Sequence, residues 1–252
     1  MSHTVIRRTE MVGASLNLGG QPLDLTEYST TGLMALAVGP RGFGKTNAGL
    51  LMAEQLSEQG WVSILIDPEG ELESIYGAAV ADADALRQRL TLRDVPIVVV
   101  SAKDALDFIP YGQVILEVAD EFRKPLFVCI DEGQLFSAAR KRADGVGEAC
   151  DIIAQFAERG RKRALDLFVT ALRYTGTLHR TMFSNSNLKL VGAQEDPTAW
   201  SALAPMFRSS GIEFKDLNAL GPGEFVLFSR RGIEKTKMPM AEGLKKVAPK
   251  AK

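Results

Sequence analysis

A glycine-rich segment at residues 39–46, with the sequence GPRGFGKT, matches the pattern G-x-x-x-x-G-K-[S/T]. It follows a continuous apolar run at residues 33–38, and a helical pattern runs from Lys45 to Gln59 before Gly60. An apolar run without alternation indicates a strand that is covered on both faces, as in a parallel sheet. The segment therefore predicts a strand, a phosphate-binding loop and a helix in direct succession.

The residue types in this segment suit a nucleoside triphosphate. Glycines let the backbone wrap around phosphates with its N–H groups pointing inward, and the helix start adds a positive end. We predict that Lys45 reaches the β- and γ-phosphates as a catalytic residue and that Thr46 binds Mg²⁺. We expect ATP and Mg²⁺ as cofactors. The predicted nucleotide-binding residues are Gly39, Pro40, Arg41, Gly42, Phe43, Gly44, Lys45, Thr46 and Asn47.

A second segment, at residues 126–132, is an apolar strand pattern that ends in two acids. Asp131 is predicted to hold Mg²⁺, and Glu132 to activate the attacking water as a general base. The alternative is an acidic helix cap that follows a strand. An adjacent Asp-Glu pair favours the class of NTPase that uses a catalytic glutamate, which contains motors more often than kinases.

Apolar strand patterns alternate with helical patterns over residues 33–210, which predicts an α/β fold with a mostly parallel sheet flanked by helices. Short hairpins are expected near both ends. The predicted domains are an N-terminal extension at 1–30, an ATPase domain at 31–240 and a basic flexible tail at 241–252. The expected helices include 71–90 and 147–159, and the expected strands are 33–38, 61–66, 95–100, 126–130, 165–170 and 188–191.

Three polar residues at predicted strand ends are further candidates for the nucleotide site. Asp67 ends a strand at the sheet edge where ligands collect, so it is either a support for the metal site or part of a Pro-Gly turn. Thr170 and Arg173 follow a later strand. They are either sensors of the γ-phosphate or an ordinary polar strand end.

Two basic segments remain. In the segment 158–163, Arg161 is the first candidate for an arginine finger, a residue that completes the nucleotide site of a neighbouring subunit, and Arg159 is the second. The alternative is a solvated helix end. Arg140, Lys141 and Arg142 lie in a loop after the second motif, where they either contact DNA phosphates or are simply solvated.

Composition limits the kinds of partner. The net charge is -1, so nucleic-acid binding requires a local basic patch instead of a global field. No stretch approaches the roughly 20 apolar residues of a membrane span, and the N-terminus lacks an apolar signal core. We therefore expect no transmembrane segment and a cytoplasmic location. Cys129 and Cys150 form no metal or disulfide framework.

The order of these segments resembles the HerA–FtsK superfamily of P-loop ATPases, and its HerA-like branch most closely. The resemblance rests on residues 39–46, 66–71 (IDPEGE), 130–132 (IDE), 160–162 (GRK) and 185–191 (NSNLKLV). It implies a RecA-like core with an additional strand and a catalytic glutamate, a homo-oligomeric, hexameric ring, and DNA moved through its pore. It also implies a nuclease, capsid or mobile-element partner, and a virion location if the protein is viral.

One residue departs from the family pattern. Leu172 stands where the family often has a glutamine before the arginine, here Arg173. The leading hypothesis is an ATP-driven DNA translocase or packaging motor. The alternatives are an assembly or secretion ATPase that acts on a protein or membrane partner, and a nucleotide switch with negligible turnover.

Overall fold

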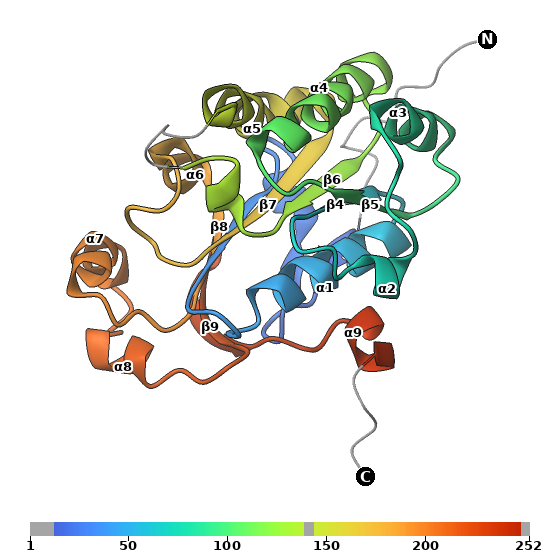
Figure 1. Cartoon of the computed structure of the whole chain (residues 1–252). Helices are drawn as coiled ribbons and strands as arrows, with labels where there is room; N and C mark the ends of the chain where they lie inside the picture. The colour runs from blue at the N-terminus through green and yellow to red at the C-terminus, as the bar shows by residue number, and fades with distance from the viewer. Residues whose placement is uncertain (1–12, 139–143, 248–252) are drawn as a thin grey trace.

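The computed structural model describes residues 13–138 and 144–247, without the side chains of Arg159 and Arg161. An eight-stranded sheet forms its centre (Figure 1), in the order β10-β9-β8-β3-β7-β6-β4-β5. Neighbouring strands from β8 to β5 are parallel, and β9 is antiparallel to both of its neighbours. The strands are β3 (Met34–Val38), β4 (Val62–Asp67), β5 (Ile97–Ser101), β6 (Leu126–Ile130), β7 (Leu165–Ala171), β8 (Leu188–Val191), β9 (Glu224–Ser229) and β10 (Gly232–Lys237).

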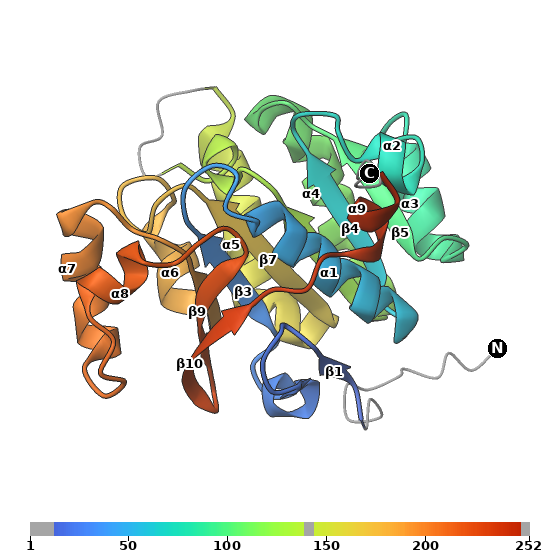
Figure 2. The ribbon, with the colours of Figure 1, turned by 90° about the horizontal axis from the view of Figure 1, so that it is seen from below.

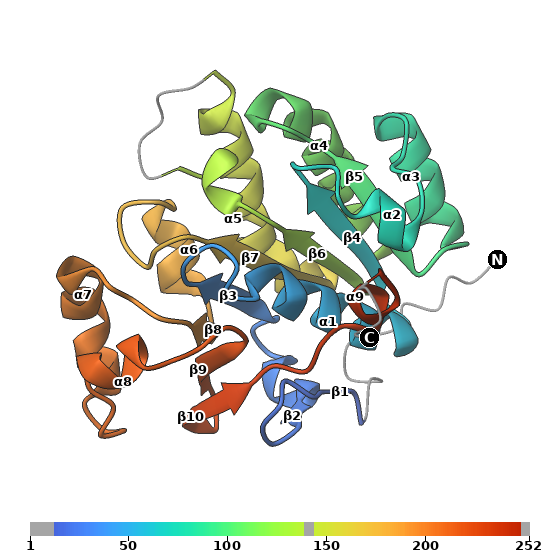
Figure 3. The same ribbon diagram turned by 60° about the horizontal axis from the view of Figure 1, so that its bottom comes forward.

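Helices cover both faces of this sheet (Figures 2 and 3). One face packs against α3 (Ala83–Leu92), α4 (Ala105–Phe122) and α5 (Val146–Arg163), and the other against α1 (Lys45–Glu58), with α2 (Glu73–Tyr76) and α9 (Glu242–Val247) beside it. Successive strand residues therefore enter opposite cores: Val128 joins the first core and Phe127 the second. This double coverage explains the apolar runs without alternation, and it confirms the predicted fold class.

Strand β7 lies between β3 and β6, the two strands that lead into the predicted phosphate and acid motifs. Val38 at the end of β3 pairs with Ala171, and Ile130 at the end of β6 pairs with Val169. The carboxyl ends of all three strands therefore meet at one edge of the sheet. This is the additional strand that the family resemblance implies.

The remaining elements lie near the ends of the chain, directly after β6, and between β7 and β9. The two-stranded sheet of β1 (Ser15–Leu16) and β2 (Leu23–Asp24) is the expected N-terminal hairpin, and β9 and β10 form the C-terminal one. Aromatic rings fix the helices between β8 and β9 to the sheet, with Phe207 and Phe228 4.7 Å apart between ring centroids. These two helices are α7 (Pro197–Phe207) and α8 (Phe214–Asn218), while α6 (Arg180–Asn185) lies between β7 and β8. Two short 3-10 helices are η2 (Leu25–Tyr28), after β2, and η3 (Gly133–Leu135), after β6.

The stretch 71–90, predicted to be mostly helical, contains two helices, α2 and α3, instead of one continuous helix. Gly77 ends α2 with a φ of 99°, a conformation that favours glycine. Asp82 then begins α3 by accepting a hydrogen bond of 2.8 Å from the backbone N–H of Ala85. The stretch between β5 and β6, to which we assigned no helix, contains α4.

Helix α5 extends to Arg163, past its predicted end at Arg159. Gly160 does not terminate the helix. It allows close packing on β7, because a Cβ atom at this position would lie 2.4 Å from the carbonyl oxygen of Leu165. The basic segment 158–163 therefore belongs to the last turns of a helix.

Residues 241–247, which we assigned to a flexible tail, contain a helix that packs on α1 and α2. Ala241 is fully buried, and the Glu54 carboxylate accepts hydrogen bonds from the backbone N–H groups of Glu242 (2.7 Å) and Gly243 (2.8 Å). These contacts give the start of α9 a fixed position. Over the two described ranges, no helix combines the length and the apolarity that a membrane crossing needs.

Candidate functional site

The glycine-rich loop lies where the sequence predicts it, between β3 and α1. Gly42 and Gly44 have φ angles of 71° and 93°, in the left-handed region that glycine adopts without strain. The loop is anchored at its entrance, because the Gly39 N–H donates to the carbonyl of Ala171 at 3.3 Å. The Phe43 ring is buried against Phe225, with ring centroids 5.8 Å apart. Phe43 therefore fixes the loop, and only its backbone is available to a phosphate.

Lys45 is almost fully buried at the first position of α1. Its ammonium group donates a hydrogen bond of 2.8 Å to the carbonyl oxygen of Pro40, across the mouth of the loop. Burial lowers the pKa of Lys45, while the carboxylates of Glu132 and Asp131 act in the opposite direction. A triphosphate between the loop and these acids would replace the Pro40 carbonyl as the partner of the ammonium group.

The polar residues at the ends of β6 and β7 form one hydrogen-bonded network with α1. The Thr46 hydroxyl donates to one oxygen of Asp131 at 2.8 Å, and the Thr170 hydroxyl donates to the other at 2.6 Å. The same Thr170 oxygen accepts a hydrogen bond of 2.9 Å from the backbone N–H of Glu132. Thr170, predicted as a sensor, thus joins the metal-binding candidate to the base candidate.

Glu132 has a φ of 48°, which is uncommon for a residue with a side chain. Such backbone strain is typical of functional positions that the surrounding structure holds in place. The Glu132 carboxylate accepts a hydrogen bond from the side-chain amide of Gln134, whose own oxygen is buried without a hydrogen-bond partner. Gln134 was not among the residues predicted from the sequence, although its place two residues after Glu132 was a usable signal.

Asp67 ends β4, but its carboxylate is occupied by its own turn. It accepts hydrogen bonds from the backbone N–H groups of Glu69 (3.2 Å), Gly70 (3.0 Å) and Leu72 (2.8 Å). These contacts favour the turn interpretation of residues 67–72 over a support for the metal site.

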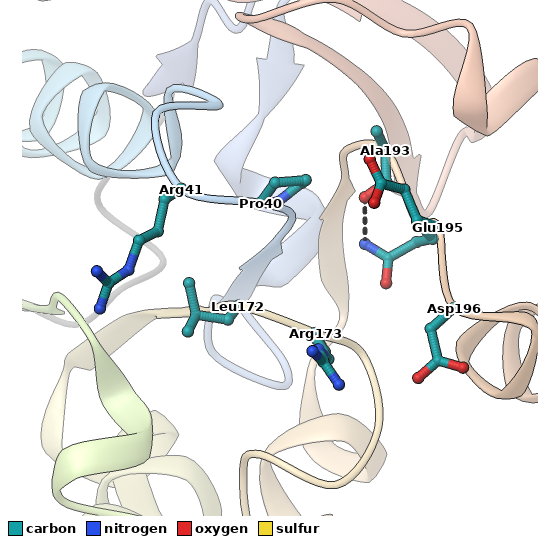
Figure 4. Close-up of a pocket in the computed structure, with 8 residues that line it drawn as sticks. Pro40, Arg41, Leu172, Arg173, Ala193, Glu195 and Asp196 are labelled. Atoms are coloured by element: carbon teal, nitrogen blue, oxygen red, sulfur yellow. Dashed lines mark hydrogen bonds between the residues drawn. The ribbon is translucent and has the colours of Figure 1, made fainter.

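A cavity of about 430 Å³ lies on the outer side of the glycine-rich loop (Figure 4). Pro40 and Arg41 line it from the loop, and Leu172 and Arg173 line it from the segment after β7. Hydrogen bonds from Thr198, together with the nearby Arg173 charge, lower the pKa of Asp196 on its far wall. Arg41 and Arg173 therefore belong to a cavity beside the phosphate loop, not to the network of Thr46, Asp131, Thr170 and Glu132.

A glutamine does line this cavity, although Leu172 occupies the position where the family often has one. Gln194, which follows β8, is buried, and its side-chain amide donates to the carbonyl of Ala193 at 2.8 Å. The sequence signal was a polar residue directly after a buried strand at the ligand-binding edge of the sheet.

Asn47 does not offer its side chain to a nucleotide. Its amide nitrogen donates to the Pro239 carbonyl, and its amide oxygen accepts from the Ala241 N–H, both at 2.9 Å. Its backbone N–H remains at the start of α1, where phosphates bind. The predicted DNA-contact residues Arg140, Lys141 and Arg142 lie outside the described residues, as do the side chains of Arg159 and Arg161.

The Thr46 hydroxyl and the Asp131 carboxylate fit a magnesium site. Mg²⁺ prefers oxygen ligands and is usually held by one or two carboxylates together with substrate phosphates and water. Within the described ranges, no group of three or more His, Cys, Asp or Glu side chains is arranged to hold a metal. Two protein oxygen ligands, the Thr46 hydroxyl and the Asp131 carboxylate, suit a metal that also binds triphosphate oxygens and water.

No protein-family model and no curated protein sequence matches the chain. Solved structures do. The genome packaging NTPase B204 of Sulfolobus turreted icosahedral virus 2, in complex with ATP-γ-S, superposes with a TM-score of 0.62 and 15% identity, over 81% of this chain and 96% of that one.

Two larger proteins also match. The conjugation coupling protein TcpA of pCW3 has a TM-score of 0.57 and 15% identity, covering 92% of this chain and 67% of that one. The cytoplasmic domain of the type VII secretion ATPase EccC of Thermomonospora curvata has a TM-score of 0.60 and 14% identity, covering 92% of this chain and 27% of that one. The chain therefore shares the fold of these three proteins over most of its length, which is the fold that the resemblance to the HerA–FtsK superfamily implied.

Proposed function

We propose that the chain binds ATP with Mg²⁺, hydrolyses the terminal phosphate, and works in a homo-oligomeric, hexameric ring that moves or packages DNA. The observation that carries the hydrolysis is the network in which Thr170 joins Asp131 to Glu132 while Asp131 accepts from Thr46. The network brings Thr46, Asp131 and Glu132 together at one edge of the sheet, beside the phosphate loop, which supports a metal-binding pair and a general base there.

Each residue then has a defined role. The loop amides and Lys45 bind the phosphates, and Thr46 and Asp131 hold the metal, which would neutralise charge on the phosphate oxygens. Gln134 and the Thr170 hydroxyl orient Glu132, and Glu132 accepts a proton from the attacking water. We assign Arg161, or else Arg159, to a neighbouring subunit's site.

The DNA and ring assignments are supported by the fold. B204 is a genome packaging NTPase, TcpA is a conjugation coupling protein, and this chain has their fold over most of its length. The basic residues Arg140, Lys141 and Arg142 are our candidates for contact with DNA phosphates. A nuclease, capsid or mobile-element protein is the expected partner.

The test of hydrolysis compares Glu132→Gln with the wild type. The variant should bind ATP normally in titration calorimetry, while phosphate release falls roughly 10²–10⁴-fold, because the amide cannot take a proton. Glu58→Gln, on the exposed end of α1, is the matched control. Normal turnover in Glu132→Gln would remove Glu132 as the base.

The test of DNA movement is displacement of the third strand of a DNA triplex by the pure protein with ATP. We expect displacement by the wild type and none by Glu132→Gln. Active hydrolysis without displacement would contradict the DNA-motor assignment.

A second candidate is an ATPase that acts on a protein or membrane partner in assembly or secretion. The observation that favours it is the match to EccC, a secretion ATPase, over 92% of this chain. It predicts that Arg140→Ala, Lys141→Ala and Arg142→Ala, combined in one variant, leave DNA binding unchanged.

A further inference from the structure

An exposed methionine lies beside the start of α1. The segment 238–241 connects β10 to α9 and crosses α1 on its way (Figures 2 and 3). Met240 is 51% exposed, whereas Met238 and Ala241 on either side of it are buried. A large apolar side chain is thus held at the surface between two buried neighbours.

Hydrogen bonds tie this segment to the phosphate loop on both sides of Met240. Asn47, directly after Thr46, binds the carbonyl of Pro239 and the N–H of Ala241 with its side-chain amide. Before that point, the N–H of Met238 donates to the carbonyl of Gly223 at 2.8 Å, and the N–H of Gly223 donates to the carbonyl of Phe43 at 3.0 Å. The backbone around Met240 therefore has a fixed position relative to the loop.

The hydrogen bond of the Thr46 hydroxyl indicates how a bound triphosphate would be oriented along the loop. The hydroxyl donates to Asp131, directly after β6, so a bound metal and a terminal phosphate would lie toward the ends of β6 and β7. Asn47 is turned by about 100° around the helix, toward the segment 238–241. A bound triphosphate would be held along the loop and the start of α1. The nucleoside at its other end would then lie on the side of α1 that carries Asn47.

We propose that Pro239 and Met240 form the platform on which the nucleobase lies. The platform rests on the proposed function, because it needs a nucleotide at the phosphate loop. A thioether is polarisable and makes favourable contacts with aromatic rings, so it suits a planar base. Covering Met240 with the base also removes apolar surface of both partners from water. The ligand class is a nucleoside triphosphate whose base adds affinity beyond that of its phosphates.

The experiment measures two affinities of Met240→Ala by titration calorimetry with Mg²⁺ present: one for ATP and one for inorganic tripolyphosphate, which has no base. We expect the affinity for ATP to fall about tenfold and the affinity for tripolyphosphate to stay at the wild-type value. Met240→Leu should keep most of the ATP affinity. Leu92→Ala, which truncates another exposed side chain on distant α3, should change neither value.

The outcomes separate this proposal from the one on which it rests. An ATP affinity of Met240→Ala within about twofold of the wild type would overturn the platform, and so would an equal loss for tripolyphosphate, which would mean a distorted loop. If the wild type bound neither ligand, the nucleotide site itself would be refuted, and the platform with it. Met240 is exposed, so Met240→Ala is expected to fold, which a thermal unfolding curve checks.

Discussion

At the scale of the residue, the site depends on one hydroxyl group. Thr170 is fully buried, donates to Asp131 and accepts from the N–H of Glu132. It thereby holds Asp131, the proposed metal ligand, and stabilises the left-handed backbone of Glu132, the proposed general base. Among the described residues, no other side chain is hydrogen-bonded to both Asp131 and Glu132.

We predict that Thr170→Val keeps the shape of the side chain but loses both contacts. The buried N–H of Glu132 then has no partner, which should lower the free energy of unfolding by about 1–3 kcal/mol. The kcat for ATP should fall at least tenfold, because a misplaced base and metal ligand act together. Urea unfolding and phosphate release measure the two effects.

Thr91→Val, at an exposed position near the end of α3, is the control for the loss of a threonine hydroxyl. Unchanged turnover in Thr170→Val would show that the network is not needed for catalysis.

At the scale of the element, α9 depends on a carboxylate supplied by α1. Glu54 accepts hydrogen bonds from two N–H groups of α9 and from the Tyr76 hydroxyl, which donates at 2.6 Å. The Tyr76 pKa is raised, mainly by burial and then by this carboxylate. One side chain thus joins α1, α2 and α9.

Glu54→Ala should leave these donors without an acceptor. We expect a loss of about 1–3 kcal/mol, concentrated in α9, because the part-buried Gly243 N–H and Tyr76 hydroxyl cost free energy when unpaired. Hydrogen exchange of the α9 amides should accelerate, while exchange in β3 and β6 should stay slow. Glu58→Ala, one turn further along α1, should leave hydrogen exchange unchanged in α9 and in the two strands. If the α9 amides were protected equally in Glu54→Ala and Glu58→Ala, Glu54 would not be what fixes the position of α9.

The sequence was most informative where a motif has its own local geometry. The loop 39–46 and the acids 131 and 132 could be predicted because each lies at the end of an apolar strand with a fixed pattern. The helix α9 could not, because its position depends on residues far apart in the chain, such as Glu54 and Gly243. Likewise, the helix predicted to end at Arg159 continues to Arg163, and the close packing of Gly160 on β7 is a contact that the sequence pattern does not show.

At the scale of the whole molecule, the proposed function requires more than one copy of the chain. We assign the trans finger to Arg161, near the end of α5, and the nucleotide site to the edge formed by β3, β6 and β7. If copies form a ring, a site in one subunit is completed by its neighbour.

Mixing two inactive variants tests this arrangement. Arg161→Ala should bind ATP but lose about 10³-fold or more in kcat, and Lys45→Ala should lose nucleotide binding. In a mixture, Lys45→Ala subunits supply the missing arginine to Arg161→Ala subunits, so phosphate release should recover in part. Arg89→Ala, on exposed α3, is the control for loss of a surface arginine. If mixing gave no recovery, the arginine would not act in trans.

The most direct test of the central claim is steady-state ATP hydrolysis by the pure protein, with and without double-stranded DNA, over a range of salt concentrations. We predict that DNA stimulates hydrolysis and that the stimulation fades as salt rises from about 50 to 200 mM, because contacts with phosphates release counterions. Hydrolysis that is indifferent to DNA at every salt concentration would contradict the DNA-motor assignment and favour a protein or membrane partner.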